Sequence, residues 1–454
     1  MTVDRRSLPV PEPPPGIQFP AVTRSQLQPG LRLWTVERRD LPLVCLLWLW
    51  HAGTSADQAD TPGLAALTAD LLDEGTSALS MSALHDALAG IGGQLDTDIG
   101  HDATVLTVLA LSRHRERAVE LLVDMAERPR LAPSDVARVK GLRLNRLRQL
   151  RHSAGALADL LFMRRLYGEH PYGRPGIGTE ASLTRFTVEQ VQAFHARLVA
   201  TPATVIIVGD ISHDEAEALV RRHLSTPERT PHPSPPVATS PTGSRLLFVP
   251  REGAAQSELR VGRVAVPRHS PAYHAMVVTN MLLGGAFVSR INMKLREEKG
   301  VTYGARSSFQ FLEQAGPFSV QASIQSETTA ESLRDVLVEL DALADVRPVT
   351  ADELDSARDG LTRGYARGFE TAEQVARAAA QLALFDLPDD TFDRFSDRVS
   401  SVTSADVTEV ARTWLRSADM QAVVVGEPSA SLTGLGGVGL GVPEHRLADD
   451  VLKG

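Results

Sequence analysis

The chain has 454 residues, of which 43% are hydrophobic and 23% are charged, a composition typical of a soluble globular protein. Its formal net charge of −9 gives no electrostatic reason to bind nucleic acid or an anionic membrane surface, so we expect neither as a partner. The single cysteine, Cys45, excludes an internal disulfide and a zinc site built from several thiolates. The length exceeds the roughly 100–200 residues of one ordinary domain, which predicts more than one domain.

We expect no secretory signal at the start of this sequence. Residues 1–24 are rich in proline and lack the apolar core of a secretory signal. The longest apolar run, Leu43 to Trp50, is less than half as long as a membrane-spanning helix requires, and it predicts a buried strand instead. We therefore expect a cytoplasmic protein.

Two regions of the chain end in the same pattern. Residues 187–210 and 403–427 each contain a threonine cap, an amphipathic helix, a short break and a β-branched strand that closes on a glycine. This internal duplication predicts two homologous domains packed around a cleft. The predicted division is a proline-rich segment 1–24, a first domain 25–223, an extended Pro/Ser/Thr-rich linker 224–244, a second domain 245–428 and a glycine-rich tail 429–454.

Within each half, the predicted strands come before the predicted helices instead of alternating with them. The strands in question are 92–99, 103–111 and 316–326, and the helices are 118–129, 135–168, 330–343 and 351–369. This segregation favours an α+β fold over a doubly wound sheet.

The segment 280–303, NMLLGGAFVSRINMKLREEKGVTY, predicts a helix that follows a glycine pair. Its apolar residues recur at Phe287, Ile291 and Leu295, and Gly300 is placed to end the helix in the left-handed conformation. The following VTYGARSSFQF alternates as a strand does. A residue in the last helical turn and one early in the strand are therefore expected to converge.

Arg296 and Tyr303 occupy these two positions. Each also has a simple structural explanation, because an arginine near a helix C-terminus interacts with the helix dipole and tyrosine is common in strands. Ser289 and Arg290, just before them, are expected to fix the helix against its neighbours.

Several stretches resemble the pitrilysin/insulinase family of zinc peptidases, especially its short bacterial and mitochondrial-processing-type members. The resemblance spans roughly residues 25–430 in the family's order. It rests on the strand ending HAG, on TPGLAALTADLLDEGT, LYGEHPYGRPGIGT and VIIVGD, and above all on LLGGAFVSRINMKLREEKGVTYG. The resemblance implies two homologous α+β domains, each an antiparallel sheet layered with helices, arranged as a clam shell. It also implies that Arg296 and Tyr303 hold the substrate backbone and stabilise the reacting carbonyl opposite a zinc ion.

The zinc-binding half of the family's site is missing. Active members carry an inverted H-x-x-E-H, in which two histidines bind zinc and the glutamate activates water. Alignment on the Gly-Thr pair at 75–76 places Ala66 and Asp70 at the histidine positions and Ala69 at the glutamate position. The third ligand, a glutamate on a later helix, has no counterpart in 136–168, which contains no glutamate. We therefore expect no metal and no other cofactor in this chain.

Other patterns have structural explanations that we prefer. His51, His85 and His101 lack metal-ligand spacing. The GLGGVG of 434–439 matches a dinucleotide fingerprint formally, but flanking prolines predict a flexible tail. The arginines of 138–151 predict a solvated or partner-facing helix more than a polyanion site.

The sequence thus predicts the non-catalytic subunit of a heterodimeric zinc metalloendopeptidase. A homologous partner with H-x-x-E-H would supply zinc and the attacking water, and this chain would supply Arg296 and Tyr303 in trans. The resemblance implies unfolded peptides as substrates. The alternatives are a homodimer, an inactive peptidase-like scaffold similar to the core proteins of respiratory complexes, and a self-associated peptide-binding protein.

Overall fold

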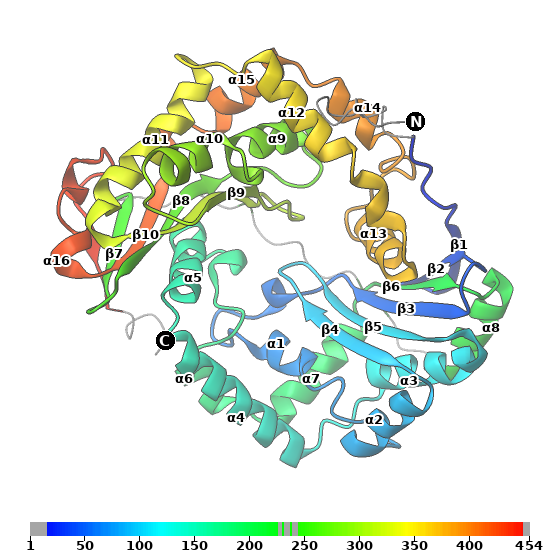
Figure 1. Ribbon diagram of the computed structural model, residues 1–454. Helices are drawn as coiled ribbons and strands as arrows, with labels where there is room; N and C mark the ends of the chain where they lie inside the picture. Colours follow the sequence, from blue (N-terminus) through cyan, green and yellow to red (C-terminus); the bar gives the residue numbers. More distant parts are fainter. Residues whose placement is uncertain (1–15, 226–228, 231–236, 238–243, 448–454) are drawn as a thin grey trace, which may run out of the picture.

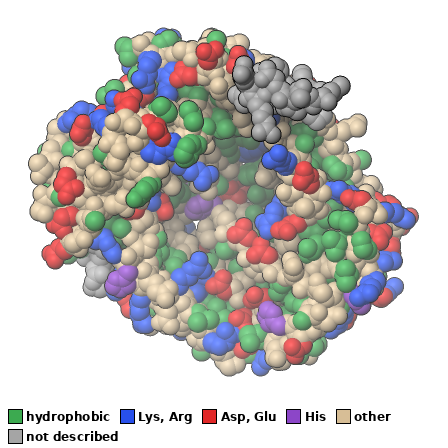
Figure 2. Space-filling view, in the orientation of Figure 1, with side chains coloured by type: hydrophobic (Ala, Val, Ile, Leu, Met, Phe, Trp, Pro, Cys, Tyr) green, Lys and Arg blue, Asp and Glu red, His purple; other side chains and the backbone are tan. Residues whose placement is uncertain are grey.

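The computed structural model describes residues 16–225, 229–230, 237 and 244–447. Two halves, each built from one sheet and its helices, curve around a central hollow that is visible on the surface (Figure 1, Figure 2). The α+β class and the two homologous domains are therefore confirmed. In the described part of the chain, no helix has the length and apolar character needed to cross a membrane.

The first sheet has six strands in the order β1-β2-β6-β3-β5-β4. These strands are β1 (Thr23–Gln28), β2 (Leu31–Glu37), β3 (Leu43–Trp50), β4 (Gln94–Ile99), β5 (Thr104–Leu111) and β6 (Ala203–Gly209). The predicted apolar strand is β3, which lies inside the sheet with Val44 to Trp50 buried. All neighbours pair antiparallel except β2 and β6, which run parallel.

The second sheet repeats this arrangement with the order β12-β7-β11-β8-β10-β9. Its strands are β7 (Leu246–Pro250), β8 (Gln256–Val264), β9 (Ala305–Phe309), β10 (Pro317–Gln325), β11 (Gln421–Gly426) and β12 (Glu444–His445). β11 pairs with β7 in parallel and with β8 antiparallel, as β6 does with β2 and β3. The helices before β6 and β11 both begin with a threonine capping box, at Thr187 and Thr403. The duplication inferred from the sequence is thus present in the topology.

The first half contains eight α-helices among its described residues: α1 (Leu64–Ala69), α2 (Met81–Gly90), α3 (Arg115–Glu127), α4 (Pro133–Leu150), α5 (Ala154–Tyr167), α6 (Glu180–Arg185), α7 (Val188–Val199) and α8 (His213–His223). The single long helix predicted over 135–168 is wrong, because α4 and α5 are separate. Ser153 accepts a hydrogen bond from the backbone N–H of Ala156 and so caps a new helix.

The helices of the second half are α9 (Tyr273–Asn280), α10 (Arg290–Asn292), α11 (Thr329–Ala344), α12 (Ala351–Thr362), α13 (Ala372–Leu384), α14 (Phe395–Ser400), α15 (Ser404–Trp414) and α16 (Pro428–Ser431). The expected helices over 330–343 and 351–369 correspond to α11 and α12, except that α12 ends at Thr362 and a short 3-10 turn, Tyr365–Phe369, follows it.

The two halves exchange one helix each. α5, from the first half, packs on β8 and β11 of the second sheet, while α13, from the second half, packs on β3 and β6 of the first sheet (Figure 1). Val375 and Leu382 of α13 are buried in one cluster with Leu47 of β3. Leu157 of α5 is buried in one cluster with Val425 of β11. Each sheet is therefore completed by the other half of the chain.

The glycine-rich segment is partly structured. Leu435, Val438 and Leu440 are buried in the second core, and β12 extends the sheet beside β7. The prediction of a flexible tail is wrong for these residues, because the apolar side chains between the glycines fill the core. Residues 448–454 lie outside the described part.

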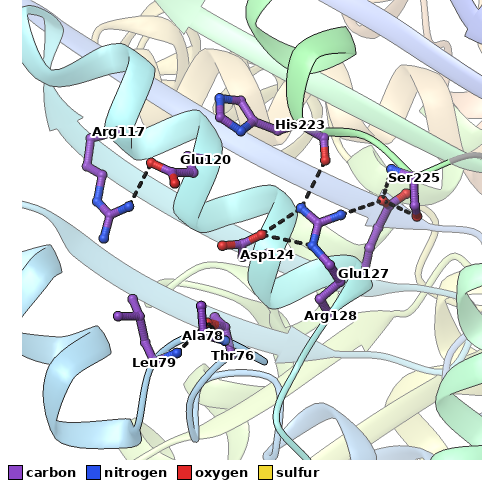
Figure 3. A network of polar contacts seen from close by, with 10 residues as sticks. All are labelled: Thr76, Ala78, Leu79, Arg117, Glu120, Asp124, Glu127, Arg128, His223 and Ser225. Carbon is purple, nitrogen blue, oxygen red and sulfur yellow. Dashed lines mark hydrogen bonds and ion pairs between the residues drawn. The ribbon is translucent and has the colours of Figure 1, made fainter.

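Most of the predicted linker also lies outside the described residues, but Arg229 and Thr230 are fixed to the first domain. The Arg229 side chain is fully buried, with Nη2 3.0 Å from Oε1 of Glu127, and the Thr230 N–H donates to the Ala200 carbonyl. Glu127 is the last residue of α3, and its other oxygen accepts hydrogen bonds from the backbone N–H and the hydroxyl of Ser225 (Figure 3). The linker therefore contributes to the packing of the first domain.

Candidate functional site

Of the aligned metal positions, Ala66 and Ala69 lie on α1, and Asp70 caps its C-terminus. Ala66 and Ala69 are buried and have no atom that could bind a metal. Asp70 forms an ion pair with Arg143 of α4, whose Nη1 also donates to the Ala66 carbonyl oxygen at 3.1 Å. The Arg143 side chain is only 7% exposed. A buried guanidinium thus contacts both ends of the i, i+4 pair that holds zinc in the family, and the residues present do not fit a zinc ion.

Asp57 fixes the other end of α1. Its two carboxyl oxygens accept hydrogen bonds from the backbone N–H groups of Gly63 and Ala65, each at 2.7 Å. Burial raises the pKa of Asp57 to about 7, against these hydrogen bonds, which lower it. Neither Asp57 nor Arg143 was singled out in the sequence. The sequence does give an indication of Arg143, because this charged residue lies on the buried face of α4 between the apolar residues Val139 and Leu147.

Restoring the motif alone is expected to leave the chain without zinc. A variant with Ala66→His, Ala69→Glu and Asp70→His would gain two ligands and a base but would keep the Arg143 cation against them, and would still lack a third ligand. Metal analysis after dialysis against zinc should find far less than one equivalent per chain. The matched comparison is the same variant with Arg143→Glu added, which replaces the cation by a carboxylate. Stoichiometric zinc in the variant that keeps Arg143 would contradict the expectation.

The three histidines considered for another metal site do not form one. His51 Nε2 lies 3.3 Å from Nη2 of Arg32 and 3.4 Å from Oγ1 of Thr204. His101 Nδ1 lies 3.3 Å from Oγ1 of Thr54, and His85 lies on α2. Across the described ranges, no group of three or more His, Cys, Asp or Glu residues is arranged to hold a metal ion.

His51 is expected to make the stability of the fold depend on pH below neutrality. Burial, and then the neighbouring Arg32, lowers the pKa of His51 from 6.5 to about 4. Between these pH values the unfolded chain binds a proton that the folded chain does not, so stability is lost as the pH falls through this window. His51→Gln is expected to reduce this loss by up to about 3 kcal/mol in urea unfolding at pH 7 and pH 4. The exposed His85→Gln is the control, and identical acid dependence in both variants would contradict the assignment.

The segment 280–303 forms a compact helical element before β9. A π-helical turn, Met281–Gly285, continues α9, and a second one, Met293–Glu298, continues α10. Ile291 and Leu295 are buried as expected. Phe287 lies before the helix and is 74% exposed, so its predicted place on the buried face is wrong. The cause is the extended conformation of the chain at Ser289, which delays the start of the helix to Arg290.

Asn292 ties this helix to β9. Its side-chain amide donates to the Ala305 carbonyl and accepts from the Ala305 N–H, each at 2.8 Å. Gly284 packs against the backbone of β9, where an added Cβ would lie 2.7 Å from the Ser307 nitrogen. These contacts fix the turn that carries Tyr303 relative to the helix.

Ser289 and Arg290 have the structural role expected of them. Arg290 is buried and forms a bidentate ion pair with Glu353 of α12, with both N···O distances at 2.7 Å. This hydrogen bonding lowers the pKa of Glu353 to about 2. Ser289 Oγ accepts a hydrogen bond from Asn292.

Arg296 and Tyr303 differ sharply in exposure. The Arg296 side chain is 13% exposed, its guanidinium carbon lies 3.4 Å from the centre of the Phe287 ring, and its Nε donates to Glu297 at 2.8 Å. Tyr303 is 94% exposed and precedes β9. Among the described residues no hydrogen bond or ring contact joins the two. Phe287 is the neighbour of Arg296 that sequence reasoning missed.

Comparison with known proteins agrees with these features. Residues 42–180 match the family model for Insulinase (Peptidase family M16), and residues 185–361 match that for the Peptidase M16 inactive domain. An uncharacterized zinc protease of Mycobacterium tuberculosis is 31% identical over 363 residues, which cover 77% of this chain and 78% of that protein. The non-peptidase homolog YmxG of Helicobacter pylori is 22% identical over 352 residues, covering 76% of this chain and 80% of the homolog.

Solved structures show the same fold. The crystal structure of a peptidase M16 inactive domain from Pseudomonas fluorescens has a TM-score of 0.84 and 26% identity, and the alignment covers 89% of this chain and 98% of that one. A protease from Helicobacter pylori aligns with a TM-score of 0.81 at 17% identity over 89% of this chain and 99% of the other. The chain therefore belongs to the insulinase family, peptidase family M16, and its residues 185–361 form a domain of the type described as inactive in that family.

Proposed function

We propose that the chain is the non-catalytic subunit of a heterodimeric zinc metalloendopeptidase, located in the cytoplasm. The observation that carries the proposal is the contrast between two elements of one chain. The aligned metal positions on α1 hold two alanines and an aspartate neutralised by Arg143. The element 280–303, in contrast, keeps Arg296 and Tyr303 on a backbone fixed by Asn292.

The contribution of this chain would be to bind and orient the peptide. The Tyr303 phenol is exposed and free to donate to a backbone carbonyl. The Phe287 ring lies against the guanidinium of Arg296. Glu297 accepts a hydrogen bond from Arg296 Nε, while Arg296 Nη1 makes no hydrogen bond with a described residue. Cation–π contact and an ion pair restrict the guanidinium without using all its donors. A preorganised donor is what a developing oxyanion requires.

A homologous partner with an intact H-x-x-E-H would hold the zinc and activate the attacking water. Unfolded peptides are the proposed substrates, as the family resemblance implies, and the hollow between the two halves is where we place them (Figure 2).

The proposal is tested by co-purification with a homologue that carries H-x-x-E-H. We expect a stable complex with about one zinc per heterodimer, no zinc in this chain alone, and peptide cleavage only by the pair. Stoichiometric zinc in this chain, or cleavage by this chain alone, would overturn the proposal.

An inactive scaffold is the second candidate, because one relative is named a non-peptidase homolog. A scaffold would form a complex, as a homodimer or with another protein, without contributing to cleavage. Peptide cleavage by the complex that depends on Arg296 distinguishes the two functions.

A further inference from the structure

A pocket lined by several charged side chains shares no lining residue with the element 280–303. It has a volume of about 230 Å³ and lies where residues 268–274, before and at the start of α9, meet residues 387–398, after α13. This volume is below the roughly 300–1,000 Å³ of sites for drug-sized ligands, so the pocket suits a small ligand.

Arg268 is a buried cation that has no anionic partner among the described residues. Its residue is 9% exposed, and its guanidinium carbon lies 3.7 Å from the centre of the Tyr273 ring. Within the described ranges its guanidinium makes no ion pair and no hydrogen bond, although it lines the pocket. Burial lowers the pKa of Arg268. A buried charge is costly unless a counter-charge lies next to it, so an anion bound in the pocket would stabilise Arg268.

The other charged groups of the pocket do not supply that counter-charge. Arg394 pairs with Asp390 at 2.7 Å, and Asp390 is the one carboxylate among the lining residues. Arg398 of α14 also lines the pocket and forms no ion pair with a described residue. The lining thus contains three guanidinium groups and one carboxylate, and neither Arg268 nor Arg398 has a carboxylate partner among the described residues.

His274 reports the resulting positive field. Burial, followed by Arg398 and Arg268, lowers the pKa of His274 to about 4. The other groups that face it across the pocket are Tyr273, His269 and the Arg394–Asp390 pair.

We propose that this pocket binds a doubly charged oxyanion of the phosphate class, held between Arg268 on one side and Arg398 on the other. Two uncompensated guanidinium groups match a dianion, and a carboxylate would leave one of them unneutralised. The bound anion would link the start of α9 to the segment that follows α13.

Inorganic phosphate, titrated calorimetrically into the full chain at constant ionic strength with chloride, tests the proposal. Saturable binding is expected, and Arg268→Gln and Arg398→Gln should each weaken it about tenfold or more. Arg398 is exposed on α14, so its variant is expected to fold even if the Arg268 variant does not. Arg222→Gln, an exposed arginine paired with Glu116 in the first half, is the control that should bind as the wild type does.

The His274 ring proton signal in NMR gives an independent readout. Saturating phosphate should raise the pKa of His274, because the anion, although singly charged near pH 4, offsets part of the field of Arg268 and Arg398. The proposal is overturned by a lack of saturable binding, by unchanged affinity in Arg398→Gln, or by equal binding of acetate at the same ionic strength.

Discussion

Replacing Arg296 with alanine is expected to lower peptide cleavage by the reconstituted pair about 100- to 1000-fold, the usual effect of losing one donor to a developing oxyanion. The loss should appear mainly in kcat, because the donor is needed most in the transition state. Tyr303→Phe removes only the phenol O–H and is expected to act in the same direction. Steady-state kinetics with a fluorogenic peptide measures both effects.

Two controls separate chemistry from assembly. Arg334 is an exposed arginine on α11, and Arg334→Ala should leave turnover unchanged. Size-exclusion chromatography should show that the Arg296 and Tyr303 variants still associate with the partner. If both variants turn over substrate like the wild type, this chain does not supply donors in trans.

The largest effect on stability is expected from Arg229→Ala. The Arg229 and Glu127 side chains are 0% and 1% exposed, so removing Arg229 leaves a buried carboxylate whose remaining cation, Arg128, lies 3.7 Å away. Loss of one partner from a buried pair costs about 3–5 kcal/mol. Urea unfolding of the variant should show a correspondingly lower free energy of unfolding, and a value within about 1 kcal/mol of the wild type would contradict the role of Arg229.

A matched exposed pair provides the comparison. Arg222 and Glu116 are 58% and 62% exposed, and Arg222→Ala should cost only about 0–1 kcal/mol. The double variant Arg229→Met with Glu127→Leu removes both charges and is expected to recover much of the stability, because apolar replacement of a complete buried pair is often neutral.

The sequence predicted the duplication because local patterns indicate it. The apolar run of β3 and the two threonine-capped helices before β6 and β11 are set by residues close together in the chain. The pattern of α5 and α13 indicates that each helix has a buried face, but not which sheet covers it. Periodicity carries no information about the partner of a face, so the exchange of these helices could not be predicted.

The residues of the candidate site that the sequence singled out came from motifs, while tertiary contacts around them could not be read from it. Ala66 and Asp70 were located by alignment on the Gly-Thr pair, and Arg296 and Tyr303 by the resemblance of 280–303. Arg143 and Phe287 were missed because their roles depend on contacts with residues distant in sequence or across a turn. The buried residues of the glycine-rich segment were missed because glycine content dominates its composition.

The exchange of α5 and α13 also bears on how a duplicated chain can evolve. Each half of the duplicated chain covers the sheet of the other half with one helix. Neither half can then be removed, because the sheet of the remaining half would lose its covering helix. Because each half covers the sheet of the other, the first half is needed for the fold whatever residues occupy the aligned positions of α1.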